Sequence, residues 1–192
     1  MELYIARHGE TIANAEKIVL GGGKDSPLTE KGIEQAESLR KPLENMTFDA
    51  IYSSPSNRAI DTINIALGNK YKVIIDKRLA GVGLGDMEGM KWAEADIIYP
   101  ESALLLIPDP VLYVPPPNGE NLSDMIKRVD SFLEDIIKMN YNKVFISTHG
   151  YVLSAIYSCI TDKSISAIGK VPIYSNCEIV RYLYNCGKWE SL

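Results

Sequence analysis

Histidine and cysteine are scarce in this chain. Its 192 residues include two histidines and three cysteines. The cysteines, Cys159, Cys177 and Cys186, are odd in number and lack the short spacing of a metal site, which argues against a disulfide framework and against a bound metal. Reduced thiols of this kind are typical of cytoplasmic proteins, so we expect the chain to work in the cytoplasm.

Long hydrophobic runs and basic clusters are also missing. No apolar run approaches the length of about 20 residues that a transmembrane helix needs, and the N-terminal stretch lacks the basic start of a signal peptide. The formal net charge is -5, without the basic stripe common in nucleic-acid-binding domains. We therefore expect no membrane, export or nucleic-acid role, and nothing in the sequence indicates the oligomeric state.

The composition that remains is that of an ordinary globular protein. Hydrophobic residues make up 46% of the chain and charged residues 23%, both near the averages for soluble domains. A chain of this length forms one domain around one core. We therefore expect a single domain over residues 1–192.

Short apolar stretches alternate with helical patterns along the chain. This alternation predicts an α/β sandwich with a mostly parallel sheet. Thr29 and Ser54 precede two of the helical patterns and are the expected N-caps, with Pro55 at the first helical position. The strand-like stretches are 3–6, 50–52, 73–75, 144–146 and 179–184, and the helical ones are 33–43, 55–66, 122–137 and 152–160.

The regular pattern breaks between residues 79 and 118. This segment is rich in glycine and contains six prolines, three of them consecutive at 115–117. Such residues interrupt both helices and strands. The apolar run Leu104–Leu106 nevertheless needs a packing partner. We expect a cap or lid insertion over about 79–118.

Both histidines occupy the same local setting. His8 and His149 each end an apolar, strand-like stretch, and each is followed by a glycine, Gly9 and Gly150. Open α/β sheets bind ligands at the carboxyl ends of their strands. A glycine at that point permits a sharp turn and lets a backbone amide approach an anion. The pattern favours a phosphate site, with Gly150 in contact with the ligand.

Two arginines accompany the histidines. Arg7 directly precedes His8, and Arg58 lies in the first turn of a predicted helix, where the helix dipole favours an anion. Guanidinium groups bind phosphoryl oxygens in a bidentate manner. Phosphoryl transfer depends mainly on positioning and on charge stabilisation. Two imidazoles and two guanidiniums therefore predict phosphoryl-transfer chemistry.

Five short motifs follow one another along nearly the whole chain. They are residues 7–11 with Asn14, residues 25–32, 53–59, 119–120 and 147–150. In content and order they resemble the motifs of the histidine phosphatase superfamily, which includes phosphoglycerate mutases, fructose-2,6-bisphosphatases and α-ribazole phosphatases. The chain looks most like the phosphatase branch with the α-ribazole phosphatases, and the resemblance implies a three-layer α/β/α sandwich.

The resemblance also implies a role for the matching residues. His8 would be the nucleophile that forms a phosphohistidine, and Arg7, Arg58 and His149 would bind the phosphoryl group. Asn14 would contact it as well. The implied protein is a phosphoric monoester hydrolase that acts on a small phosphorylated substrate, and no metal or organic cofactor is implied.

One position departs from the family pattern. Residues 78–89 resemble the segment around the family's proton donor, where a glutamate is expected at position 81, but this chain has Gly81. Asp86 and Glu88 match other places in the same segment. Either would act as the proton donor only if the loop were rearranged, and both are candidates for that role.

Two alternatives to a phosphatase stay open. A mutase would return the phosphoryl group to a bound substrate, although mutases that resemble this chain are usually longer around the cap. A regulatory phosphoester-binding protein would keep the anion site with weak turnover, because the acid is missing at Gly81. Phosphate release from several phosphoesters separates these possibilities.

Overall fold

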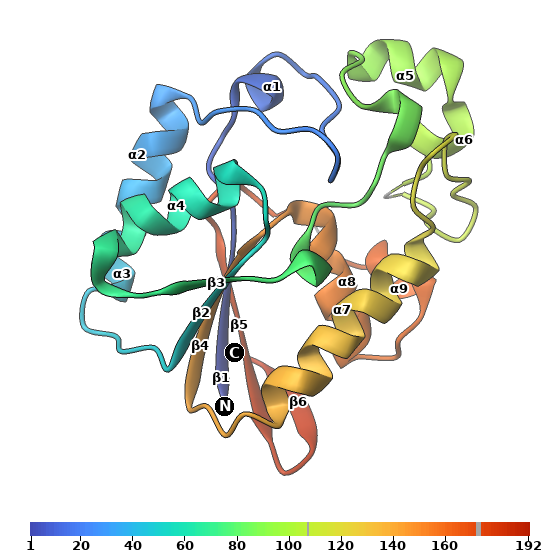
Figure 1. The fold of residues 1–192 in the computed structure, drawn as a ribbon. Coiled ribbons are helices and arrows are strands. Elements are labelled where there is room, and N and C mark those ends of the chain that lie inside the picture. The colour runs from blue at the N-terminus through green and yellow to red at the C-terminus, as the bar shows by residue number, and fades with distance from the viewer. Residues whose placement is uncertain (107, 172–173) are drawn as a thin grey trace.

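A six-stranded sheet forms the centre of the computed structural model, which describes residues 1–106, 108–171 and 174–192 (Figure 1). The strands are β1 (Glu2–Arg7), β2 (Ala50–Ser53), β3 (Val73–Ile75), β4 (Lys143–Thr148), β5 (Ile179–Asn185) and β6 (Lys188–Ser191). Their order in the sheet is β3-β2-β4-β1-β5-β6. The first four strands are parallel to one another, whereas β5 and β6 each run antiparallel to a neighbour. The expected α/β fold with a mostly parallel sheet is confirmed.

The hairpin of β5 and β6 adds a strand that the sequence pattern does not predict. Cys186 and Gly187 form its two-residue turn, with φ angles of 48° and 80°. Positive φ at both turn positions matches the twist of the flanking strands. The segment Lys188–Ser191 is polar and mostly exposed at the sheet edge, so it lacks the apolar alternation that would mark a strand.

Helices cover both faces of the sheet, which gives the three layers (Figure 1). The helices are α1 (Ile12–Ala15), α2 (Glu30–Ser38), α3 (Arg40–Leu43), α4 (Asn57–Leu67), α5 (Trp92–Ile98), α6 (Pro100–Ala103), α7 (Leu122–Ile137), α8 (Gly150–Ile160) and α9 (Ile165–Ile168). Along β1, Tyr4 and Ala6 pack with α2, α3 and α4, whereas Leu3 and Ile5 pack with α7, α8 and α9. The alternation of side chains along one strand therefore serves two core clusters, one on each face of the sheet. The expectation of one core is wrong in this respect, because the central sheet separates the buried side chains of its two faces.

The amphipathic pattern over 122–137 forms the long helix α7, as expected. Its buried residues recur at intervals of three and four and so share one helix face. Burial of a large apolar side chain is worth roughly 1.5–3 kcal/mol, so this face anchors the helix on the sheet. The buried residues are Leu122, Met125, Ile126, Val129, Phe132, Leu133 and Ile136.

The helical stretch 33–43 is divided into α2 and α3 instead of forming one helix. Pro42 has no N–H to donate to the carbonyl of Ser38, so a continuous helix would lose a hydrogen bond at this point. The start of α2 is as expected, because Thr29 Oγ1 accepts a hydrogen bond of 2.9 Å from the backbone N–H of Gly32.

The start of α4 differs from expectation by two residues. The helix begins at Asn57 with Ser56 as the N-cap, and not at Pro55 with Ser54 as the N-cap. The backbone N–H of Ser54 instead donates to the carbonyl of Ser147 in β4, at 3.0 Å. The backbone of Ser54 therefore continues the hydrogen bonding of the sheet, and the helix starts only after Pro55.

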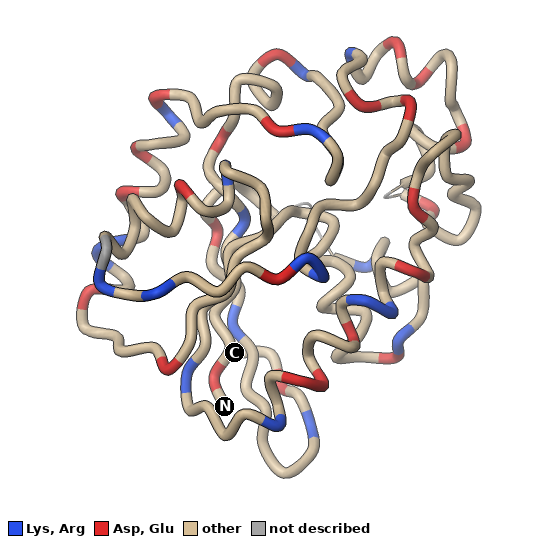
Figure 2. Tube along the Cα trace, viewed as in Figure 1, with Lys and Arg blue, Asp and Glu red and all other residues tan. Residues whose placement is uncertain are grey.

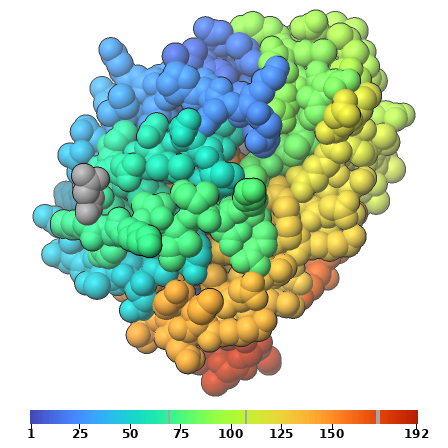
Figure 3. All heavy atoms as spheres, viewed as in Figure 1, coloured from blue at the N-terminus to red at the C-terminus, as the bar shows by residue number. Residues whose placement is uncertain are grey.

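The described part of the segment 79–118 lies beyond the carboxyl ends of the parallel strands and contains α5 and α6 (Figure 1). It contacts the loop after α1, where the N–H of Val19 donates to the carbonyl of Met90 at 2.8 Å and Ile18 pairs with Lys91. The space-filling view shows this segment meeting the N-terminal part of the chain across one end of the molecule (Figure 3).

Charged residues of both signs are interspersed along the chain trace in the view drawn (Figure 2). This distribution agrees with the small net charge of -5. Within the described residues, no helix has the length and apolar character required to cross a bilayer.

Candidate active site

The carboxyl ends of β1 and β4 bring the two histidines together. The strands are adjacent and parallel, with Arg7 paired to Thr148, so His8 and His149 follow at the same level of the sheet. Their ring centroids are 5.2 Å apart and their planes meet at 64°. Both side chains are buried, with exposed fractions of 5% for His8 and 4% for His149. The two strand–histidine–glycine units therefore form one site.

The ring of His8 is held in a single tautomer. Its Nδ1 lies 2.8 Å from the carbonyl oxygen of Gly9. A carbonyl only accepts hydrogen bonds, so Nδ1 carries the proton and Nε2 keeps a lone pair. Burial, and then the positive charge of Arg58, lower the pKa of His8 from 6.5 to about 3. The imidazole is therefore neutral near pH 7, as a nucleophile must be.

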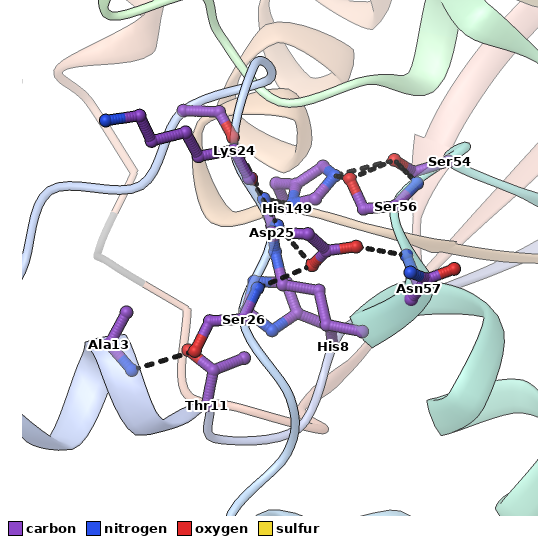
Figure 4. Close-up of polar contacts among 12 residues, drawn as sticks. His8, Thr11, Ala13, Lys24, Asp25, Ser26, Ser54, Ser56, Asn57 and His149 are labelled. Atoms are coloured by element: carbon purple, nitrogen blue, oxygen red, sulfur yellow. Dashed lines mark hydrogen bonds and ion pairs between the residues drawn. The ribbon is translucent and has the colours of Figure 1, made fainter. Parts of the chain in front are cut away.

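The ring of His149 is engaged at both nitrogens. Nη2 of Arg58 lies 3.2 Å from Nδ1, and a guanidinium only donates, so Nδ1 is the acceptor. Nε2 then carries the proton and donates to Ser54 Oγ at 2.7 Å, with Ser56 Oγ at 3.4 Å (Figure 4). Burial, followed by the charge of Arg58, holds the pKa of His149 well below its usual value. This imidazole is also neutral.

Arg58 lies in the first turn of α4, as the sequence predicts, and is 1% exposed. Its Nη1 donates to the carbonyl of Lys24 at 3.0 Å and to Asp25 Oδ1 at 2.8 Å. Besides its contact with His149, Nη2 donates to the carbonyl of Gly21 at 3.0 Å. These contacts fix the guanidinium beside both histidines.

Asp25 joins the loop after α1 to the start of α4. Its Oδ1 accepts from Arg58. Its Oδ2 accepts from the backbone N–H of Asn57 (Figure 4). Burial alone would raise the pKa of Asp25, but the hydrogen bonds from Arg58, Ser26 and Asn57 outweigh burial and lower it. The carboxylate therefore stays ionised and holds Arg58 in position.

The two arginines retain unpaired donors. Nη1 of Arg7 donates to the carbonyl of Tyr174 at 2.7 Å. The Nε atoms of Arg7 and Arg58 are buried and have no hydrogen-bond partner among the described residues. An unpaired buried donor costs about 1–3 kcal/mol, and more for a charged group. An anionic oxygen bound here would remove that cost.

A cavity of about 270 Å³ opens beside these groups. Arg7, His8, Arg58 and His149 all line it. Asn14 and Gly150, the other two expected ligand contacts, also line it. The remaining described lining residues are Ile18, Leu20, Gly81, Val82, Trp92, Tyr151, Ser154 and Val171.

The two candidate proton donors are not among the residues that line this cavity. Asp86 is exposed, and its Oδ1 accepts from Asn118 Nδ2 at 2.9 Å. Glu88 is buried, and its Oε1 accepts from the backbone N–H groups of Leu84 at 3.1 Å and Gly23 at 3.3 Å. Both carboxylates are therefore engaged elsewhere, and the loop does not adopt the rearrangement that either role requires.

Gly81 lines the cavity at the position where the resemblance implies a glutamate. It is not one of the glycines with positive φ, so its backbone conformation is open to other residues. A Cβ atom at Gly81 would lie 3.3 Å from the carbonyl carbon and oxygen of Gly21 and 3.4 Å from the nitrogen of Gly22. The loop at 21–22 thus packs against the face from which a side chain would emerge.

Other residues at the site were not singled out from the sequence. Asp25 and Ser54 lie within motifs that carry the family resemblance, and that position is the signal by which they are found. Trp92 and Tyr151 reach the cavity from distant segments. No local pattern marks them, because only the tertiary fold brings them to His8.

The ionised side chains of this cavity are cationic. Arg7 and Arg58 are the charged members of the described lining residues. Within the described residues, no group of three or more His, Cys, Asp or Glu side chains is arranged to hold a metal ion. The polar groups that meet here fit a phosphoryl anion.

Comparison with known proteins points to one family. The family model described as histidine phosphatase superfamily (branch 1) matches residues 3–192. Phosphoserine phosphatase 1 of Hydrogenobacter thermophilus is 30% identical over 168 residues, which is 86% of this chain and 79% of that protein.

Solved structures share the fold over the length of the chain. YhfR of Bacillus stearothermophilus is 32% identical with a TM-score of 0.91, and the match covers 99% of this chain and 94% of that one. The α-ribazole phosphatase of Shigella flexneri is 25% identical with a TM-score of 0.89, and the match covers 100% of this chain and 95% of that one.

Proposed function

Because this chain belongs to the histidine phosphatase superfamily, we propose that its reaction is the hydrolysis of a small phosphomonoester through a phosphohistidine on His8. The chain is a phosphoric monoester hydrolase, and its relatives include proteins named phosphoserine phosphatase and α-ribazole phosphatase. In the proposed roles, His8 is the nucleophile, and Arg7, Arg58 and His149 bind the transferred group. Asn14 and Gly150 add further contacts to its oxygens.

The observation that carries this proposal is the pair of unpaired guanidinium donors beside a neutral imidazole. Nε of Arg7 and Nε of Arg58 are buried without a partner among the described residues, and both side chains line the cavity with His8. A phosphoryl dianion supplies the acceptors that both donors lack. His8, whose Nε2 keeps a lone pair, lines the same cavity and would face the bound anion.

The reaction proceeds by two displacements at phosphorus. Nε2 of His8 attacks, the ester P–O bond breaks, and its electron pair leaves with the alcohol oxygen. The phosphorylated ring now carries a positive charge, which the hydrogen bond from Nδ1–H to the carbonyl of Gly9 stabilises. Water then attacks phosphorus, the P–N bond breaks, and its electron pair returns to Nε2 while the water releases a proton to solvent.

His149 takes up a proton when substrate binds. A phosphoryl dianion favours the charged form of a neighbouring imidazole and so raises the pKa of His149. Once protonated, Nδ1 donates to a phosphoryl oxygen in place of accepting from Arg58, while Nε2 keeps its hydrogen bond to Ser54. Arg58 Nη2 is released toward the same oxygens.

Asn14 and Gly150 are placed to complete the anion site. Oδ1 of Asn14 already accepts from the backbone N–H of Thr11 at 3.2 Å, which leaves its amide N–H groups for the ligand. Gly150 is the first residue of α8, where backbone N–H groups and the helix dipole favour an anion.

We assign the choice of substrate to the cap over about 79–118, which contributes Gly81, Val82 and Trp92 to the cavity. We also assign the reaction to the cytoplasm. The three cysteines are free thiols, two of them buried, which suits a reducing compartment.

Covalent trapping tests the nucleophile directly. Rapid acid-free quench after mixing with phenyl phosphate, followed by intact mass and peptide mapping, should locate one phosphoryl group on His8. His8→Ala should lose both the adduct and turnover. Undiminished turnover in a correctly folded His8→Ala protein would rule out this mechanism.

Replacement of Arg58 tests the phosphoryl site. Arg58→Lys keeps the charge but loses the planar fork, and the loss of one charge-assisted hydrogen bond lowers kcat/KM by about ten- to a hundredfold. The matched control is Arg40→Lys on α3, an exposed arginine away from the cavity, which should retain normal kcat/KM. Normal rate and normal phosphate inhibition in Arg58→Lys would contradict the assignment.

A further inference from the structure

Polar and apolar side chains both line the cavity beside His8. The polar ones are Arg7, His8, Asn14, Arg58, His149 and Ser154. A set of larger apolar and aromatic side chains, here called the apolar wall, comes from the loop after α1, the cap, α8 and the segment after α9. The apolar wall consists of Ile18, Leu20, Val82, Trp92, Tyr151 and Val171.

The apolar wall offers no charge to an ionised leaving group. Arg7 and Arg58 are the charged side chains among the described lining residues. In the proposed complex the phosphoryl group engages both of them. A carboxylate, an ammonium or a second phosphate on the leaving group would lose its water without gaining an opposite charge, which is strongly unfavourable. Phosphoserine carries both an ammonium and a carboxylate and therefore fits this cavity poorly.

None of the described residues that line the cavity has a carboxyl group to protonate the leaving oxygen. Gly81 stands at the expected position, and Asp86 and Glu88 are held outside by Asn118 and by backbone N–H groups. General acid catalysis is worth about 100- to 10,000-fold in rate. An alkoxide, whose parent alcohol has a pKa near that of water at about 15.7, needs such help most. A phenolate, whose parent pKa is about 10, needs it far less.

From these features, and resting on the proposed hydrolysis at His8, we infer that the substrates are compact aryl phosphates with uncharged leaving groups. The volume of about 270 Å³ is at the small end for ligand sites, which limits the leaving group to a few rings. Trp92 and Tyr151 supply aromatic surface of the kind that packs against another ring.

The reaction balances without a protein acid. When Nε2 of His8 bonds to phosphorus, the aryl P–O bond breaks and the electron pair leaves on a phenolate. That phenolate takes its proton from water. Hydrolysis of the phosphohistidine consumes one water and returns a proton to solvent, so the sum is an aryl phosphate and water giving a phenol and inorganic phosphate.

A panel of matched esters separates charge from leaving-group basicity. We would measure kcat/KM for phenyl, naphthyl, para-carboxyphenyl, para-aminomethylphenyl and benzyl phosphates. Phenyl and naphthyl phosphate should exceed the two charged aryl esters by about tenfold or more, because the aryl oxygen is similar and only the charge differs. Phenyl phosphate should exceed benzyl phosphate by about a hundredfold, because benzyl alcohol is a much poorer leaving group.

Each outcome of the panel has a definite reading. A charged aryl ester as good as phenyl phosphate would overturn the inference about charge. Benzyl phosphate as good as phenyl phosphate would overturn the inference about the leaving group and reveal another acid. In both cases the phosphatase and its His8 adduct would stand. Absence of turnover on every ester and of any adduct on His8 would overturn the proposed function itself.

Substitutions in the apolar wall test whether the leaving group binds there. Leu20→Lys should raise kcat/KM for para-carboxyphenyl relative to phenyl phosphate by about tenfold, because it supplies the missing opposite charge. The control is Met46→Lys. Met46 is a half-buried apolar residue that lines a different hollow, so this variant should leave the ratio unchanged.

Trp92→Ala gives a second test that adds no charge. It should lower kcat/KM for naphthyl phosphate several-fold more than for phenyl phosphate. Equal losses for the two esters would overturn the inference that the aryl group packs against the apolar wall.

Discussion

Ser54 Oγ lies 2.7 Å from Nε2 of His149. Because Arg58 donates to the other ring nitrogen, the hydrogen bond runs from His149 to Ser54. Ser54 in turn donates to Ser56 Oγ at 3.3 Å. The orientation of the second histidine is therefore set by a hydroxyl from the connection between β2 and α4, and not by a carboxylate.

Removal of the Ser54 hydroxyl should lower the pKa of His149 in the substrate complex. Ser54→Ala deletes the acceptor for Nε2–H, which stabilises the protonated ring, so the pKa of His149 in the complex falls. The basic limb of kcat should then move to lower pH, and kcat above that limb should drop roughly three- to tenfold. The pH profile of kcat measures both effects.

The matched variants for this test are Ser54→Thr and Ser56→Ala. Ser54→Thr keeps the hydroxyl and should restore the basic limb. Ser56→Ala removes a hydroxyl oxygen that lies 3.4 Å from Nε2 of His149. This hydroxyl makes no capping hydrogen bond at the start of α4, so the variant should change the pH profile of kcat little. An unchanged basic limb in Ser54→Ala would show that the contact does not hold the protonated ring.

The two buried imidazoles should make the fold sensitive to mild acid. The pKa of His8 is lowered to about 3 and that of His149 is also lowered, chiefly by burial. In the unfolded chain both titrate near pH 6.5, so below that pH the unfolded state binds more protons and the free energy of unfolding falls as pH falls. The slope approaches about 1.4 kcal/mol per pH unit for each histidine.

Urea unfolding between about pH 7 and pH 4.5 measures this dependence. These are the only two histidines of the chain, so His8→Gln and His149→Gln should each reduce the slope by about one proton. Equal slopes in the parent and in both variants would mean that neither imidazole is held neutral by the fold.

A carboxyl group at position 81 should help esters with basic leaving groups. Gly81→Glu should raise kcat/KM for benzyl phosphate relative to phenyl phosphate, so a plot of log kcat/KM against leaving-group pKa becomes shallower. The new Cβ would lie 3.3 Å from the backbone of Gly21, whose carbonyl accepts from Arg58. The loop must therefore shift slightly, and KM should rise for every ester.

Gly81→Ala is the matched control for this shift of the loop. It brings the same Cβ without an acid, so it should raise KM while the benzyl-to-phenyl ratio stays that of the parent chain. If Gly81→Glu and Gly81→Ala gave the same ratio, the added carboxyl group would not reach the leaving oxygen.

Local patterns are enough to predict which residues bring the two histidines of the candidate site together. His8 and His149 each end an apolar strand and precede a glycine, and these are short-range features that survive in any packing of the chain. The prediction that Arg58 lies in the first helical turn is confirmed although α4 begins two residues later than expected, because a shift of two residues still leaves Arg58 at the helix N-terminus.

Contacts between distant segments determine the orientation of Glu88 and the composition of the apolar wall. Whether Glu88 faces the cavity depends on the N–H groups of Leu84 and Gly23, and Gly23 lies 65 positions away in the chain. The apolar wall likewise joins Trp92 to Tyr151 through the packing of the cap. Gly81 already marks the missing glutamate in the sequence. Long-range pairings leave no periodic trace in one sequence, so the position of Glu88 outside the cavity and the apolar residues around the cavity do not follow from it.

The pairing of Arg7 with Thr148 also limits how the chain tolerates changes in length. Successive side chains of a strand point to opposite faces, so one residue deleted from β4 would turn the imidazole of His149 away from His8. Two deleted residues would restore the face but displace the ring by roughly 6–7 Å, more than the present 5.2 Å between the two centroids. Insertions and deletions are therefore compatible with activity only away from these strands, as in the exposed turn at Cys186 and Gly187.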